Sequence, residues 1–332
     1  MLNVRLPALA VLFGLSILSV SSSSAVTLQE DFSANPAAHG WRSFGDPELF
    51  SWDSTRQNLR VTWDSSRTNS YFCHPLGTTL GKDDDFSLAL DLRLSDIATN
   101  IKSGPFEIAV GFLNFAAATN TTFERGSGVD PVHGPRNIVE LDYFPAGYYA
   151  GFGDVAPSLS PTIVSADNTF ASGFDLLELT TNDLFHISLA YSASDQTLRT
   201  VISRNGSPFG PIAEVTLATN FTDFRVDTVA ISSYSDFGDD YDSVLGHGWI
   251  DNLVITTPTP PVAQVVGSWN SGQWQVQVTT HTNWLYSLER TTDFVAWQAV
   301  SPSVAGSGTT LLLQDTSPPP VAAFYRVSAT RP

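Results

Sequence analysis

The stretch NIVELDYFP, residues 137–145, contains the residues whose types and spacing could do chemistry. Its alternation predicts a β-strand on which Glu140 and Asp142 share one face, about 6.5 to 7 Å apart along the strand. Such a pair could hold a cation, contact sugar hydroxyls, act as nucleophile and acid in glycoside hydrolysis, or form only a polar face. The spacing alone leaves these alternatives open.

Aromatic residues follow the same strand closely. Exposed rings stack against the apolar faces of sugars while carboxylates accept hydroxyl hydrogen bonds, although Phe144 and one tyrosine could equally belong to the core. The predicted ligand-binding residues are Glu140, Asp142, Tyr143, Tyr148 and Tyr149.

A second acidic group lies in SDFGDDYDS, residues 235–243. Its carboxylates are the hard oxygen ligands that Ca²⁺ prefers, although an acidic loop can also be simply solvated. The predicted calcium ligands are Asp236, Asp239, Asp240 and Asp242. Cys73 is the single cysteine and is expected to be buried on a strand, so no intramolecular disulfide and no zinc site are expected.

Composition favours an exported protein whose partners are neutral ligands or cations. Residues 1–25 resemble a signal peptide, with Arg5 before an apolar run and a small-residue cleavage site at residues 23–25. The chain has 33 acidic and 16 basic residues in 332, a net charge of −17. This charge disfavours nucleic acid and anionic surfaces, and no later segment is apolar enough to predict membrane insertion.

Period-2 alternation predicts an all-β fold. In SLALDLRL, Leu88, Leu90, Leu92 and Leu94 face one side, and FEIAVGFL and FHISLAY repeat the pattern. Asn205-Gly206 is a strong signal for a tight hairpin turn, and the prolines after it indicate an edge strand. Many short strands with frequent Gly and Pro predict a sandwich or barrel.

A proline-rich segment, residues 257–262, predicts a linker between two domains. We expect a large β-sandwich over residues 26–256. Residues 263–332 contain five further strand candidates and are expected to form a small module of immunoglobulin or fibronectin-like size.

The opening QEDFS and the closing GWIDNLVI, together with VELDYF, give residues 26–256 a resemblance to the concanavalin A-like jelly-roll sandwiches, which include legume lectins and family 16 glucanases. The end of the chain, with YSLERTTDFVAW and FYRV, resembles a C-terminal module of secreted bacterial proteins. The resemblance places Glu140 and Asp142 on the central strand of a concave face.

The resemblance also separates two activities. The glucanase pattern ExDxxE implies Glu140 as nucleophile and Asp142 as its helper, but Pro145 stands at the position of the general acid and has no proton to donate. The lectin pattern implies metal ligands on this strand followed by Asn and Asp ligands, of which Asp154 alone is well spaced.

We therefore predict a secreted, lectin-like protein that binds neutral glycans on its concave face without cleaving them, with calcium assistance. The alternatives are a glycoside hydrolase or lyase of the same fold and a structural protein of surface assembly.

Overall fold

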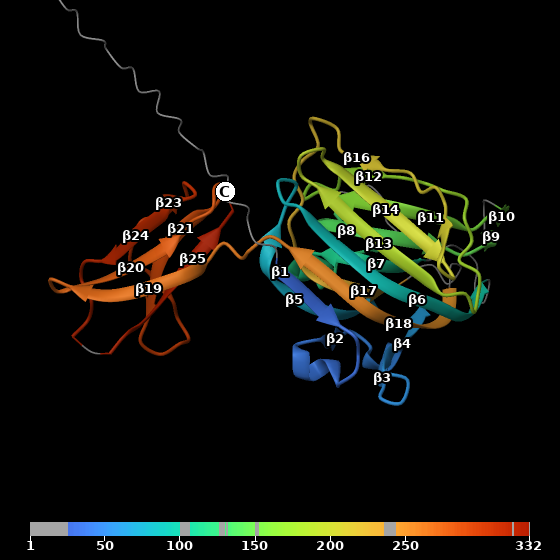
Figure 1. The fold of residues 1–332 in the computed structure, drawn as a ribbon, viewed down its shortest axis with the longest axis horizontal. Coiled ribbons are helices and arrows are strands. Elements are labelled where there is room, and N and C mark those ends of the chain that lie inside the picture. The colour runs from blue at the N-terminus through green and yellow to red at the C-terminus, as the bar shows by residue number, and fades with distance from the viewer. Residues whose placement is uncertain are drawn as a thin grey trace, which may run out of the picture.

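The computed structural model describes residues 26–99, 107–125, 130, 132–149, 153–235, 244–320 and 322–331. The described chain is almost entirely β (Figure 1), which confirms the predicted fold class. Its short helices are η1 (Pro36–His39), η2 (Pro47–Leu49) and α1 (Phe115–Ala118). None of the helices among the described residues is long and apolar enough to cross a bilayer.

One sheet of the sandwich has nine strands, with β6 and β18 at its centre. Its main path is β15-β14-β13-β6-β18-β4-β3, while β1 pairs with β18 and β16 with β14. The strands are β1 (Val26–Glu30), β3 (Phe50–Asp53), β4 (Asn58–Asp64), β6 (Phe86–Thr99), β13 (Phe185–Ser192), β14 (Thr197–Arg204), β15 (Ser207–Phe209), β16 (Val215–Thr216) and β18 (Val244–Thr257).

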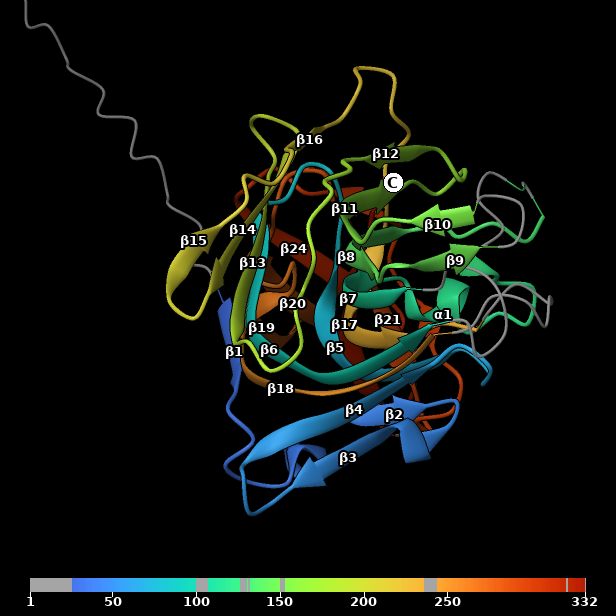
Figure 2. The same cartoon turned by 90° about the vertical axis from the view of Figure 1, so that its right-hand side faces the viewer.

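The other sheet has seven strands and carries the predicted site at its centre. Its order is β12-β11-β8-β7-β17-β5-β2. The strands are β2 (Arg42–Phe44), β5 (Ser70–Leu80), β7 (Ile108–Leu113), β8 (Ile138–Phe144), β11 (Ser158–Val164), β12 (Phe170–Ser172) and β17 (Val226–Ser233). A separate pair, β9 (Gly147–Tyr149) and β10 (Gly153–Val155), follows β8 (Figure 2).

The main core lies between these two sheets. Leu88, Leu90, Leu92 and Leu94 of β6 are all buried, as their alternation predicts, and the hairpin at Asn205-Gly206 has both residues at positive φ. Cys73 is fully buried on β5, as predicted.

A second, smaller core covers the outer face of the seven-stranded sheet. Tyr71, Ile138 and Tyr234 contribute to it, together with Ala118 and Phe123 from the segment that contains and follows α1. All residues of β7 are consequently buried, because the strand has packed groups on both of its faces.

Seven further strands follow the Pro-rich segment and form two small sheets (Figure 1). One contains β19 (Ala263–Asn270), β20 (Gln273–Thr279) and β24 (Thr310–Asp315), and the other contains β21 (Leu285–Thr291), β22 (Gln298–Ala299), β23 (Val304–Ala305) and β25 (Phe324–Thr330). Buried side chains of this region, among them Tyr286 and Leu288 of β21 and the preceding Trp284, form a core separate from the two cores of the sandwich.

The pairing of β7 with β8 depends on a close approach at Gly111. Gly111 lies opposite Glu140, and a Cβ at Gly111 would lie 2.3 Å from the Val139 carbonyl oxygen and 2.5 Å from Glu140 Cα. Both neighbours are backbone atoms, so a side chain there requires the strands themselves to shift.

We expect Gly111→Ala to lower the free energy of unfolding by about 1 to 3 kcal/mol, because overpacking forces the central strands apart. Urea denaturation measures the change. Gly246→Ala is the matched control, since its nearest contact for a new Cβ is Ile108 Cδ1 at 3.6 Å. Equal urea midpoints for the two variants would contradict the expectation.

Candidate functional site

Strand β8 positions the two predicted carboxyls. Val139, Leu141 and Tyr143 point into the core between the sheets, so Glu140 and Asp142 lie together on the outer face. Hydrogen bonding to β7 on one side and β11 on the other fixes the register of this strand. The backbone around both acids is therefore held in the middle of the sheet.

Both carboxyls are buried and meet one guanidinium. Arg125 Nε donates to Glu140 Oε1 at 2.8 Å, and Arg125 Nη2 donates to Asp142 Oδ2 at 2.8 Å. A third acid, Glu107, places its Oε1 3.1 Å from the same Nε without accepting a hydrogen bond. Tyr234 donates its hydroxyl to Glu140 Oε2 at 2.8 Å. We call Glu107, Arg125, Glu140 and Asp142 the cage.

The cage is closed to solvent. Glu140 is 2% exposed, Asp142 0%, Glu107 4% and Arg125 8%. Neither carboxyl of β8 lies open to a ligand in this structure, and their first contact is the protein's own cation. The two acids thus hold the segment that ends at Arg125 against the sheet.

Burial shifts the protonation of the cage. Loss of solvent, reinforced by the neighbouring Asp142 charge, raises the pKa of Glu140 to about 8. Burial also raises the pKa of Asp142, and it raises the pKa of Glu107 well above its ordinary range. Burial disfavours the charged form of Arg125, but the surrounding carboxyls outweigh this and raise its pKa. These shifts favour the protonated forms of Glu107 and Glu140 and so reduce the negative charge around Arg125.

The cage does not fit a divalent ion while Arg125 is in place. Oxygens of Glu107, Glu140 and Asp142 lie within 4.8 Å of one another, a spacing suited to metal ligands. The guanidinium nitrogens lie 2.8 to 3.1 Å from these oxygens, so the group occupies the space an ion would need. Calcium requires oxygen ligands at about 2.3 to 2.6 Å.

The other predicted site residues are not brought into the cage. Tyr143 is on the opposite face of β8 and is buried between the sheets. Tyr148 and Tyr149 belong to β9, where Tyr148 pairs with Asp154 of β10; their side chains lie outside the described part of the chain. The predicted calcium ligands Asp236, Asp239, Asp240 and Asp242 also lie outside the described residues.

Sequence reasoning missed two members of the cage. Glu107 immediately precedes β7. The alternation of this strand puts Glu107 on the face away from Ile108 and Val110, and this position of a carboxyl is a signal that could have identified it. Arg125 lies in a segment without periodicity. Only the folded chain shows that this arginine reaches the acids of β8.

A pocket of about 550 Å³ lies beside the cage. Phe123 and Glu124 line it and immediately precede Arg125, while Ser235 lines it and follows Tyr234. The rest of the lining comes from the end of β2 and the residue after it, from the residues before β5, and from the end of α1 and the segment after it: Phe44, Gly45, Thr68, Asn69, Ala118, Thr119, Asn120 and Thr121. Most of the polar groups in this lining are uncharged hydroxyls and amides.

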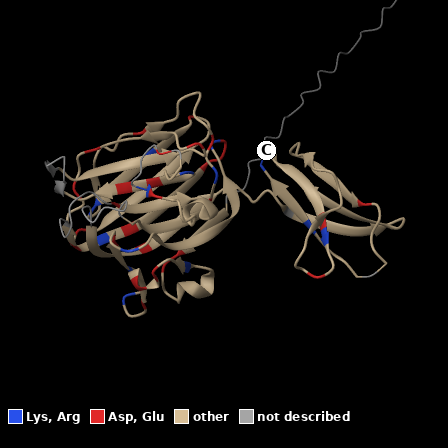
Figure 3. Ribbon diagram, turned by 180° about the vertical axis from the view of Figure 1, so that it is seen from behind, with Lys and Arg blue, Asp and Glu red and all other residues tan. Residues whose placement is uncertain are grey.

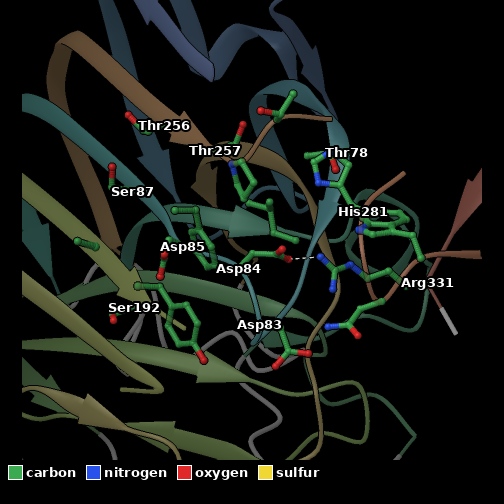
Figure 4. A pocket seen from close by; sticks show the side chains of 18 of the residues that line it. Thr78, Asp83, Asp84, Asp85, Ser87, Ser192, Thr256, Thr257, His281 and Arg331 are labelled. Atoms are coloured by element: carbon green, nitrogen blue, oxygen red, sulfur yellow. Dashed lines mark hydrogen bonds and ion pairs between the residues drawn. The ribbon is translucent and has the colours of Figure 1, made fainter. Parts of the chain in front are cut away.

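A second pocket, of about 700 Å³, lies where the sandwich meets the C-terminal strands. Figure 4 shows Asp84 of the β5–β6 turn and Arg331 pointing toward each other across it, and the two form an ion pair. Arg331 also donates to the Thr79 carbonyl at 3.2 Å and stacks on the Trp284 ring at 4.6 Å. Arg331 therefore connects the two parts of the chain.

Comparisons with known proteins give structural similarity only. No family model and no curated protein matches the sequence. Among solved structures, the chain is similar to lectin II from Ulex europaeus, with 12% identity, a TM-score of 0.49, and coverage of 72% of this chain and 100% of the lectin. Peanut lectin with a 9-mer peptide matches with 12% identity and a TM-score of 0.44, over 71% of this chain and 99% of that one.

The metal-free form of lectin I-B4 from Griffonia simplicifolia matches with 11% identity and a TM-score of 0.42, over 70% of this chain and 100% of the lectin. In all three cases nearly the whole lectin is covered and identity is low.

The raised pKa of Glu140 gives the cage a defined pH response. Glu140 is protonated in the folded state up to about pH 8, but it ionises near its ordinary value of 4.5 when unfolded. The stability it contributes is therefore fully present below pH 4.5 and is lost as pH rises toward 8. We expect the free energy of unfolding to fall by about 1 kcal/mol per pH unit in this window, and more steeply where Glu107 adds to it.

Urea midpoints measured from pH 5 to pH 8 test this response. Glu140→Gln should flatten the slope, because an amide does not titrate, whereas Glu178→Gln at an exposed position should leave it unchanged. A midpoint in the parent protein that stays level or rises over this range would contradict the expectation.

Arg331→Ala should loosen the junction, because it removes the ion pair with Asp84 and the contact with Thr79. We expect cleavage by elastase on the carboxyl side of Val262, next to the Pro-rich segment, to become several-fold faster. Arg326→Ala is the matched control, because Arg326 stacks on Trp297 at 4.2 Å within the C-terminal strands. Equal cleavage rates in the two variants would count against a connecting role for Arg331.

Proposed function

We propose that this protein binds neutral glycans, without cleaving them, in the pocket beside the cage. The observation that carries the proposal is the composition of the pocket wall: the exposed hydroxyls of Thr68 and Thr121 stand beside the half-buried ring of Phe44. Neutral hydrogen-bonding groups with an aromatic surface suit a polyhydroxylated ligand. A volume of about 550 Å³ lies within the range of small-ligand pockets.

Charge supports an uncharged ligand. The chain carries −17, and Glu124 adds a carboxylate to the pocket wall. On the face shown in Figure 3, acidic and basic residues lie interspersed over the sandwich. The net charge of the chain would repel an acidic polysaccharide, whereas it would not repel a neutral one.

Binding without cleavage is favoured by the position of the acids. A general acid must lie within hydrogen-bond reach of the leaving oxygen, and a nucleophile must reach the sugar itself. Glu140 and Asp142 are enclosed and engaged with Arg125. In this proposal they act through Arg125 as supports of the pocket.

The proposal also includes a location outside the cytoplasm and assistance by calcium, and both rest on residues that the structure does not describe. The export signal of residues 1–25 supports action outside the cytoplasm. Calcium assistance rests on the acidic loop with Asp236, Asp239, Asp240 and Asp242, because Arg125 fills the cage. The C-terminal strands would serve as a spacing or docking module.

Binding to a panel of neutral polysaccharides, with pectin and alginate as acidic comparisons, tests the proposal. Thr68→Val and Thr121→Val each remove one exposed hydroxyl with little change of shape, and we expect each to weaken binding about five- to tenfold. Thr292→Val, at an exposed threonine in the bend that follows β21, is the matched control.

Retention on a neutral glycan, weakened in both pocket variants and unchanged in the control, would support the proposal. Absence of retention on every neutral glycan, or equal retention by all variants, would overturn it. Repeating the measurement with a chelator tests the calcium part separately.

A further inference from the structure

The cage combines the ligand arrangement of a metal site with a cation supplied by the chain. Oxygens from Glu107, Glu140 and Asp142 converge within 4.8 Å, and the Arg125 guanidinium stands among them. Two of its nitrogens donate hydrogen bonds of 2.8 Å to different acids. A planar guanidinium with several fixed donors matches such a set of carboxyls better than a point charge does.

We propose that Arg125 takes the place of a divalent cation in this cage and acts as a positioning residue that assembles the adjacent pocket without a metal. The part concerning the pocket rests on the proposed glycan binding, whereas the part concerning the cation stands on the cage alone.

The segment 114–125 shows what Arg125 positions. Its start is fixed because Asp227 accepts a hydrogen bond from Phe115 N at 2.9 Å, and its middle is fixed because Tyr71 donates to the Ala118 carbonyl at 3.0 Å. Its end is fixed by the cage through Arg125. Five pocket residues, Thr119, Asn120, Thr121, Phe123 and Glu124, lie between the second and third of these anchors. Asn69 Nδ2 also donates to the Phe123 carbonyl at 3.0 Å in this stretch.

Removing the guanidinium should turn the cage into a metal site. Arg125→Ser leaves a space enclosed by three buried carboxyls. A divalent ion can occupy it by displacing the protons that these acids retain, with water completing its shell. We expect Arg125→Ser to bind one more Ca²⁺ or Mn²⁺ per chain than the parent, measured by isothermal titration calorimetry with the metal alone. The number of metal ions bound per chain by the parent protein is the baseline, so any ion bound by the acidic loop of residues 235–243 is already counted in it.

The thermal stability of Arg125→Ser should increase when the same metal is added. At a metal concentration about a hundredfold above its dissociation constant, Tm of Arg125→Ser should rise by about 5 °C or more relative to chelator, and by more than any rise in the parent. Arg199→Ser is the matched control, because Arg199 also pairs with two carboxylates, Asp195 and Glu214, but on the exposed surface. The double variant Arg125→Ser with Glu140→Gln removes one ligand and should lose the additional ion.

The outcomes separate the two parts of the inference. An additional ion in Arg125→Ser, absent from the control and the double variant, supports the cation role even if no glycan is bound by any form. Glycan affinity that falls at least fivefold in Arg125→Ser and returns when the metal is added supports the positioning role.

An Arg125→Ser variant that takes up no additional ion overturns the proposal. The same holds if the variant remains unfolded both with metal and with chelator, because the cage then does not accept a replacement cation. If the ion is bound but leaves the weakened glycan affinity unrestored, the positioning role is overturned and the cation role remains.

Discussion

The rest of the site depends on one buried interaction, the contact of the Arg125 guanidinium with three carboxyls on the outer face of a sheet. Burying charged groups is costly unless they are paired and hydrogen-bonded. One cation cannot neutralise three carboxylates, and burial raises the pKa values of Glu107 and Glu140, which favours their neutral forms. The charge that remains fixes a long loop segment to the sheet.

This interaction also explains why the seven-stranded sheet differs from a usual antiparallel sheet. Such sheets commonly pack one face on the core and expose the other to water. Here the segment that contains and follows α1 covers the outer face and contributes Ala118 and Phe123 to a second core. The central strands β7 and β8 are therefore buried on both faces, and the polar residues of β8 lie in an interior.

The arrangement separates the charged groups of the cage from the surface that we propose binds a ligand. Charge is concentrated in the enclosed cage, while the neighbouring pocket presents mostly neutral hydroxyls and amides. Residues far apart in sequence, such as Phe44, Thr121 and Ser235, meet in that pocket because the cage and the sheet hold their segments together. In this arrangement the acids of β8 support the wall of the pocket from beneath.

The sequence by itself determined the all-β class, the alternation of β6 and β13, the turn at Asn205-Gly206 and the shared face of Glu140 and Asp142, because these follow from the local period of two residues and from turn chemistry. Only the tertiary structure decided that the shared face is buried and that Arg125 and Glu107 complete it. Sequence periodicity reports which side chains share a face, but it carries no information on what covers that face. A loop with no period supplied the covering segment and its cation.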